Sequence, residues 1–254
     1  MSSVRVVIGA GRPNKLPALV CEYSIKKHNP GAEVIHTYDR PFMYGNDRTL
    51  HRDRWSGPIQ WIGTNPPMGT MFSFARHMVP EICGFKGDAI YVDSDMLIFE
   101  SMEQIMEIDM GQATVLGVQG SHQNAVQRMD CAALLKWTIG FLLRSNHSGN
   151  DLQRNAHLPK GAFQRRIPKG WNDLERRTPN TKLLHYTQMP TQPWVKPGHL
   201  HGDVWFEHLA EACASGFIGR GTVEEEIRTQ DVRTTWPAAM YPQPHVLEEL
   251  KVRL

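Results

Sequence analysis

The chain has 254 residues, of which 41% are hydrophobic and 21% are charged, and its formal net charge is +2. This length predicts one α/β domain, residues 1–254, that buries a full core without disulfides. The nearly neutral charge argues against a nucleic-acid-binding protein, and the short basic stretch Gln164 to Lys169 reads as a solvated face. The four cysteines stand far apart without a CxxC pair, so we expect a reducing, cytoplasmic compartment.

The N-terminal segment, Met1 to Ile8, has one early arginine and then only a short apolar run before Gly9. That run is shorter than the apolar core of a secretory signal peptide, and no later segment approaches the length of a transmembrane helix. We therefore expect no transmembrane segment and at most peripheral contact with a membrane.

The first part of the chain predicts a strand, a helix and a second strand. Val4 to Ile8 (VRVVI) is β-branched and apolar and meets the turn Gly9-Ala10-Gly11. Leu16 to Lys27 has apolar residues at mostly helical spacing, and Glu33 to Tyr38 reads as the second strand. This order is typical of an α/β fold, so we expect a mixed, mostly parallel sheet covered by helices on both faces.

Further elements follow along the chain. Arg40 to Met68 has weak periodicity, so we expect a loop there with one short strand, Ile59 to Ile62. The remaining expected elements are a helix over Thr70–Ile82, a strand over Ala89–Val92, a short helix over Ser101–Glu107 capped by Ser101, a strand over Thr114–Val118, a polar loop over Ser145–Asn150, a strand over Lys182–Tyr186 and a helix over Val204–Ala214. Met129 to Trp137 is apolar but fits neither period. Residues 219–254 are a C-terminal extension whose role stays open, either wrapping the surface or joining copies into a homo-oligomer.

The segment Gly87 to Glu100 (GDAIYVDSDMLIFE) places two carboxylates at the end of an apolar strand. In an extended chain, side chains at i and i+2 point to the same side, so Asp93 and Asp95 face one spot. Two like charges at a buried strand end are costly unless a cation neutralises them, and Mg²⁺ or Mn²⁺ shared with substrate phosphates suits such a pair. Ligands of open α/β sheets bind at this end of the strands. The alternative is that both aspartates are turn residues that cap local amides.

Three segments together resemble glycosyltransferase family 8. AIYVDSDMLIFESMEQI is similar to the Asp-x-Asp region of that family, and FSFARHMVP carries Arg76 where members keep a basic residue that contacts the donor. Downstream, TKLLHYTQMPTQPW resembles the family's strand end with a histidine, followed by a Lys-Pro-Trp-like element. The resemblance covers Val4 to Phe206 and implies a single GT-A-like (Rossmann-like) domain and a UDP-sugar donor.

The resemblance also implies which residues hold the donor and its metal. His185 becomes the third ligand of Mn²⁺ or Mg²⁺ beside Asp93 and Asp95, and a neutral imidazole leaves room for phosphate oxygens. Taken alone, His185 lies on an apolar run and would more often be a core histidine. Arg76 and Ser94 are expected at the donor.

Gln192 departs from the family pattern. It stands where the family usually has a lysine that contacts the phosphates, and the spacing from His185 to Trp194 is one residue longer than usual. We expect Gln192 at this position to contact the donor phosphates without that positive charge, and Lys196, two residues past Trp194, could replace the lost cation.

Five further residues are weaker site candidates. By resemblance, Gly9 and Ala10 at the end of the first strand contact the nucleoside, because glycine lets the backbone approach a ligand; a plain tight turn is the alternative. The stretch DLQRN is similar to an acidic and glutamine-containing stretch beside the reacting sugar, so Asp151 and Gln153 are candidates for positioning the acceptor or stabilising the sugar cation. Asp130 either lines the sugar pocket or ends a helix or strand.

The segment HLHGD offers a different metal chemistry. His199, His201 and Asp203 form a possible zinc set. A loop near the acceptor or donor sugar is the other interpretation, and Asp203 can instead cap the following helix.

The resemblance implies transfer of a hexose, glucose or galactose, from UDP to a hydroxyl of a carbohydrate, lipid-linked or small-molecule acceptor, with retention of the anomeric configuration. The cation would act as a Lewis acid on the departing diphosphate. Two other functions stay open. A sugar-1-phosphate nucleotidyltransferase also needs a nucleotide fold and a metal held by carboxylates, and a non-catalytic nucleotide-sugar-binding protein is suggested by Gln192.

Overall fold

The computed structural model describes residues 4–10, 14–37, 75–120, 124–138, 154–155, 157–228 and 241–254. The chain divides into two compact units. The sheet unit comprises Met1–Gly11, Gly31–Asp93 and Met102–Lys169, and the helical unit comprises Arg12–Pro30, Ser94–Ser101 and Gly170–Leu254. Among the described residues, no helix has the length and apolar character needed to cross a membrane.

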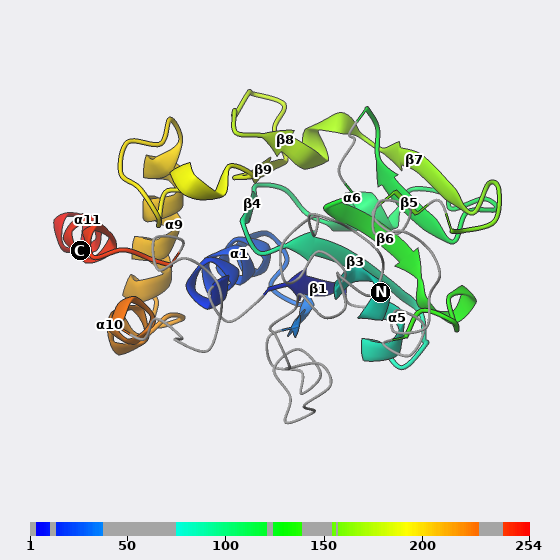
Figure 1. Ribbon diagram of the computed structural model, residues 1–254, viewed down its shortest axis with the longest axis horizontal. Coiled ribbons are helices and arrows are strands. Elements are labelled where there is room, and N and C mark those ends of the chain that lie inside the picture. The colour runs from blue at the N-terminus through cyan, green and yellow to red at the C-terminus, as the bar shows by residue number, and fades with distance from the viewer. Residues whose placement is uncertain are drawn as a thin grey trace, which may run out of the picture. The chain divides into compact units, whose positions relative to one another are not determined.

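The sheet unit is built on a six-stranded sheet in the order β2-β1-β3-β6-β5-β7 (Figure 1). The strands are β1 (Arg5–Gly9), β2 (Glu33–His36), β3 (Asp88–Asp93), β5 (Val115–Val118), β6 (Val126–Asp130) and β7 (Phe163–Ile167). β1 pairs in parallel with β2 and β3, and β5 pairs in parallel with β7, whereas β6 runs antiparallel to both of its neighbours. The predicted α/β fold with a mixed, mostly parallel sheet is therefore confirmed.

The core of the sheet unit explains why its central strands read as continuous apolar runs. All four residues from Ala89 to Val92 are fully buried, as expected for a strand covered on both faces. On one face, Val7, Tyr91 and Met129 pack with residues of the 3₁₀ turn η3 (Ala75–Met78) and the short helix α5 (Val79–Ile82). These two elements are the described part of the helix expected over residues 70–82.

Two local expectations in the sheet unit need correction. The short helix α6 (Glu103–Met106) begins after Met102, not after Ser101, whose hydroxyl donates instead to Asn29 Oδ1 at 3.2 Å. The apolar segment that fitted neither period is the end of β6 followed by the 3₁₀ turn η4 (Cys131–Ala133). Arg128 in β6 donates to carbonyl oxygens at the end of α6, which satisfies acceptors that a helix end leaves open.

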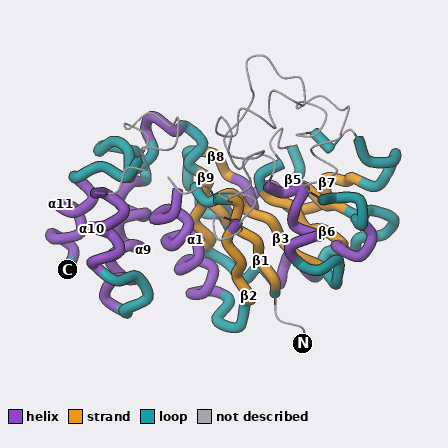
Figure 2. The backbone as a smooth tube through the Cα atoms, turned by 60° about the horizontal axis from the view of Figure 1, so that its bottom comes forward, coloured by secondary structure: helices purple, strands orange, loops and turns teal. Residues whose placement is uncertain are grey.

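The described part of the helical unit contains four helices and a three-stranded sheet (Figure 2). The helices are α1 (Lys15–His28), α9 (Gly202–Ala214), α10 (Arg220–Arg228) and α11 (His245–Arg253), the strands are β4 (Met96–Ile98), β8 (Asp173–Leu174) and β9 (Leu183–His185), and the 3₁₀ turns are η5 (Lys169–Asn172) and η6 (Met189–Thr191). One apolar core contains Leu16 of α1, Leu97 of β4 and Trp205 of α9. Val223 and Leu250 belong to this core, so the described parts of residues 219–254 pack with α9.

Candidate metal centre

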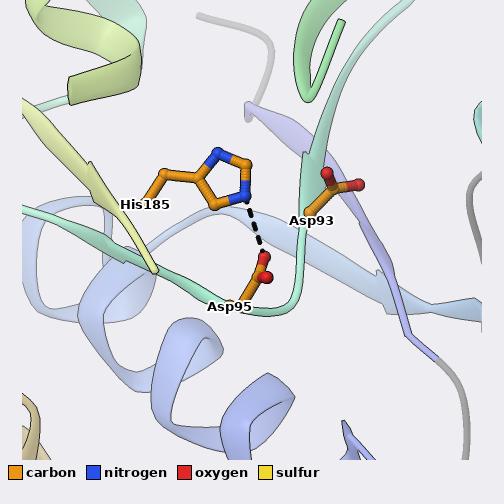
Figure 3. Close-up of side chains that lie close together, drawn as sticks. All are labelled: Asp93, Asp95 and His185. Carbon is orange, nitrogen blue, oxygen red and sulfur yellow. Dashed lines mark ion pairs between the residues drawn. The ribbon is translucent and has the colours of Figure 1, made fainter. Parts of the chain in front are cut away.

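The pairing of β4 with β9 brings Asp95 and His185 together. In this antiparallel pair Met96 lies opposite His185, and the backbone nitrogen of Tyr186 donates to the carbonyl oxygen of Asp95 at 2.9 Å. His185 Nε2 consequently lies 3.1 Å from Asp95 Oδ1, and the two residues are only 3% and 8% exposed. Figure 3 shows the imidazole and this carboxylate facing each other. The apolar run after the Asp-x-Asp segment is thus the strand that positions the histidine.

Asn172 determines which nitrogen of the His185 imidazole carries the proton in the neutral ring. His185 Nδ1 lies 2.9 Å from Asn172 Oδ1, and a carbonyl-type oxygen only accepts, so Nδ1 is the protonated nitrogen. In the neutral form of the ring, which is the form that binds metals, Nε2 then carries the lone pair and faces Asp95 Oδ1. That oxygen is buried and accepts no hydrogen bond from any residue that the structure describes. The two atoms lie 3.1 Å apart, so either a proton on Nε2 or a metal ion bound by both atoms would join them, and the residue types fit a metal ion.

Gln192 holds the other oxygen of Asp95. Its side-chain nitrogen donates to Asp95 Oδ2 at 3.0 Å and to the carbonyl oxygen of Tyr186 at 2.7 Å. Both amide hydrogens are therefore used inside the protein, and the residue is 3% exposed. The expected phosphate contact of Gln192 needs correction, because the amide has no hydrogen left to donate to a donor phosphate. Lys196 is exposed.

Asp93 completes a group of three potential ligands. Asp93, Asp95 and His185 each offer one ligand atom, and the three atoms lie within 4.8 Å of one another (Figure 3). Among the described residues, no other group of three or more histidine, cysteine or acidic side chains brings its ligand atoms this close together. Two oxygen or nitrogen ligands of one divalent ion stand about 3–4 Å apart, so small side-chain rotations would suffice to close this group around an ion.

Gly9 and Arg76 lie beside the aromatic ring of Tyr91. In the pairing of β1 with β3, Gly9 lies opposite Asp93, and a Cβ at Gly9 would lie 2.0 Å from the hydroxyl oxygen of Tyr91. The guanidinium of Arg76 lies 5.4 Å from the centre of the Tyr91 ring. Ala10 is buried, and its backbone nitrogen donates to Thr37 Oγ1 at 2.9 Å. Gly9 is thus required where the Tyr91 side chain needs space.

The weaker candidates divide into two groups. Asp151 and Gln153 lie outside the described residues. In the pairing of β3 with β6, Asp130 lies opposite Asp88. Asp88 begins β3 and Asp93 ends it, and this separation is about 16 Å along a strand. The Asp130 carboxylate accepts hydrogen bonds from the backbone nitrogens of the η4 turn, so this residue caps a turn instead of lining a sugar pocket beside Asp93.

The possible zinc set is not assembled. His199 Nε2 lies 2.9 Å from Glu175 Oε2, whereas His201 Nε2 accepts a hydrogen bond from the backbone nitrogen of Arg177. Asp203 pairs with Arg253 and does not cap α9, whose N-cap residue is His201. The zinc alternative and the expected cap at Asp203 are both wrong, because each side chain is committed to a different partner.

The Glu175–His199 pair stabilises the loop that follows β8. Burial alone raises the pKa of the Glu175 carboxyl, but hydrogen bonds from His199, Thr187 and the backbone nitrogen of Gln188 outweigh it and lower the pKa to about 2. Glu175 itself has a left-handed backbone, with φ of 57°. Such a conformation persists where surrounding contacts fix it.

The comparisons with known proteins agree with this architecture. No protein-family model matches the chain. Protein CDI from Arabidopsis thaliana is 23% identical over 236 residues, which cover 82% of this chain and 86% of that protein.

Two solved structures share the fold. The galactosyltransferase LgtC, solved with donor and acceptor sugar analogs, has a TM-score of 0.53 at 14% identity, with 82% of this chain and 96% of that chain covered. The glycosyltransferase GlyE of Streptococcus pneumoniae TIGR4 has a TM-score of 0.55 at 16% identity, and this chain covers 60% of its length with 82% of its own. The chain therefore has the GT-A fold of these glycosyltransferases.

Proposed function

We propose that the protein is a metal-dependent, retaining glycosyltransferase of the family 8 type. It moves a hexose, glucose or galactose, from a UDP-sugar to a hydroxyl of a carbohydrate, lipid-linked or small-molecule acceptor. The observation that carries the proposal is the group of ligand atoms that Asp93, Asp95 and His185 bring within 4.8 Å of one another. It occurs in a chain that has the fold of glycosyltransferases.

In this proposal, Asp93, Asp95 and His185 hold Mn²⁺ or Mg²⁺, and the bound ion supplies the positive charge that a departing diphosphate needs. Asn172 and Gln192 keep His185 and Asp95 in the orientation that points their lone pairs at one spot. Second-sphere contacts of this kind typically change metal affinity or activity by about 10–100-fold.

The donor and acceptor contacts are part of the same proposal. Arg76, Ser94 and Lys196 would bind the donor, and Gly9 and Ala10 would line the nucleoside at the end of β1. Residues 1–254 would work as one catalytic domain. The acceptor side would involve Asp151 and Gln153, with the enzyme in the cytoplasm or at a membrane surface.

A thermal-shift screen tests the proposal. UDP and competing nucleoside diphosphates are compared with and without Mn²⁺, using wild type, Asp95→Ala and Asp109→Ala, whose exposed carboxylate serves as the matched control. A ligand at about 100 times its Kd adds about 2.7 kcal/mol, which raises the Tm by several degrees. We expect this rise for UDP with Mn²⁺ in wild type and Asp109→Ala, and its loss in Asp95→Ala.

The same screen, together with two assays of released products, separates the alternatives. A rise that needs no metal, or one that Asp95→Ala retains, rules out the proposed centre. Slow release of hexose from UDP-glucose or UDP-galactose would distinguish a transferase from a mere binding protein. Release of pyrophosphate from a nucleoside triphosphate and a sugar phosphate would instead identify a nucleotidyltransferase.

A further inference from the structure

We propose that Tyr91 is a positioning residue for the metal centre, and that Gly9 is a glycine because Tyr91 occupies the space beside it. The inference rests on the proposed function, since it concerns how Asp93 is presented to the cation. It assigns to Gly9 a cause other than close approach of a nucleotide.

The contact that orients Asp93 comes from its own strand. Tyr91 and Asp93 are two residues apart in β3, so their side chains project to the same face. The hydroxyl of Tyr91 donates to Asp93 Oδ1 at 2.7 Å. A hydroxyl has one proton, and here it forms a charge-assisted hydrogen bond to a carboxylate. With Oδ1 held, the direction of Oδ2 is fixed as well.

Tyr91 is itself immobilised by its surroundings. Its side chain is fully buried in the core of the sheet unit, where it packs with Val7 and Met129. The guanidinium of Arg76 lies 5.4 Å from the centre of the ring and donates to the carbonyl oxygen of Asn124 at 2.6 Å. A ring packed on all sides cannot swing its hydroxyl away from Asp93, so the hydrogen bond is pre-organised before a cation binds.

The neighbouring strand leaves room for this hydroxyl. A Cβ built at Gly9 would lie 2.0 Å from Tyr91 Oη, 2.6 Å from Cζ and 2.8 Å from Cε2. Gly9 is a strand residue without a positive φ, so its backbone does not require glycine. Space for the phenol is therefore a sufficient physical reason for a glycine there.

The test is the affinity for Mn²⁺ alone, measured by the loss of the free-ion signal in electron paramagnetic resonance. Tyr91→Phe keeps the packed ring and removes the donor, so we expect Mn²⁺ binding to weaken by about 10–100-fold. The matched control is Tyr23→Phe, which removes a hydroxyl from α1 in the helical unit and should leave the affinity unchanged. The Tm of metal-free Tyr91→Phe should fall by no more than a few degrees, which shows that the fold is kept.

A double-variant cycle shows whether Tyr91 acts through Asp93. If it does, Tyr91→Phe combined with Asp93→Asn loses no more affinity than Asp93→Asn alone, whereas independent effects multiply. Multiplying losses, or an unchanged affinity in Tyr91→Phe, would overturn the role of Tyr91 while Asp95→Ala still abolishes binding. Failure of wild type to bind Mn²⁺, or full binding by Asp95→Ala, would overturn the proposed function itself.

Discussion

Replacement of Gln192 by leucine tests whether a buried amide holds Asp95 in place. Leucine has nearly the volume of glutamine but donates no hydrogen bond, so Asp95 Oδ2 and the carbonyl oxygen of Tyr186 both lose their donor. A buried acceptor left without a partner costs about 1–3 kcal/mol, and more when it is charged. We therefore expect Gln192→Leu to lower the free energy of unfolding by about 2–6 kcal/mol.

The assay is urea unfolding followed by tryptophan fluorescence in metal-free buffer, with the slopes compared to confirm a common transition. Gln188→Leu is the matched control, because it makes the same change four residues upstream at an exposed side chain. The control should stay within about 0.5 kcal/mol of wild type. A loss in Gln192→Leu no larger than in Gln188→Leu would refute the assignment of a supporting role to this amide.

Two further measurements test other contacts. Gly9→Ala places a Cβ 2.0 Å from Tyr91 Oη, so overpacking should lower the free energy of unfolding by about 1–3 kcal/mol. The control is Gly31→Ala, whose new Cβ meets nothing within 4 Å. It should show no such loss in the same urea titration. For Glu175, burial raises the pKa of the carboxyl, but hydrogen bonds outweigh burial and lower this pKa from 4.5 to about 2. Because the folded pKa lies below the unfolded one, the carboxylate stabilises the fold by up to about 3 kcal/mol above pH 4.5. This contribution is lost as the pH falls toward 2. The difference in unfolding free energy between wild type and Glu175→Gln should shrink across that window, and a difference independent of pH would contradict the reasoning.

Hydrophobic periodicity predicted the strands that are buried on both faces and the helices that bury one stripe. Strands β1 and β3 are β-branched and covered on both faces, so their apolar runs are continuous, and α1 and α9 bury one stripe in a single core. Strands β6 and β7 were not predicted, because they carry polar side chains that only the tertiary structure satisfies. Arg128 in β6 reaches the carbonyl oxygens at the end of α6, and Arg165 in β7 donates to Val118 and Asn124. The basic stretch that read as a solvated face is largely this strand.

The site was predictable as far as local spacing reaches. Asp93 ends β3 and Asp95 lies in the bend before β4, so their short spacing in the sequence, not the alternation of one strand, keeps them near each other. The alternation rule applied within β3, from Asp93 back by two residues, would have indicated Tyr91. The nearness of His185 followed only from a family resemblance, since the sequence does not reveal that β4 pairs with β9. The supporting amide of Asn172 carries no sequence signal of its own, because an asparagine after a tryptophan is equally consistent with a turn.

In the proposed metal centre, the contacts of Gln192 account for a glutamine at the position where family 8 usually has a lysine. At 3% exposure and 3.0 Å from Asp95 Oδ2, a lysine ammonium would form a buried ion pair with that carboxylate. The negative charge of Asp95 would then be neutralised from within, and the attraction for a divalent ion would fall. An amide fixes the same oxygen through a dipole and would leave the full charge of Asp93 and Asp95 for the proposed cation. A buried glutamine here is therefore compatible with a metal centre, provided that the positive charge for the donor phosphates comes from another residue, for which Lys196 is the exposed candidate.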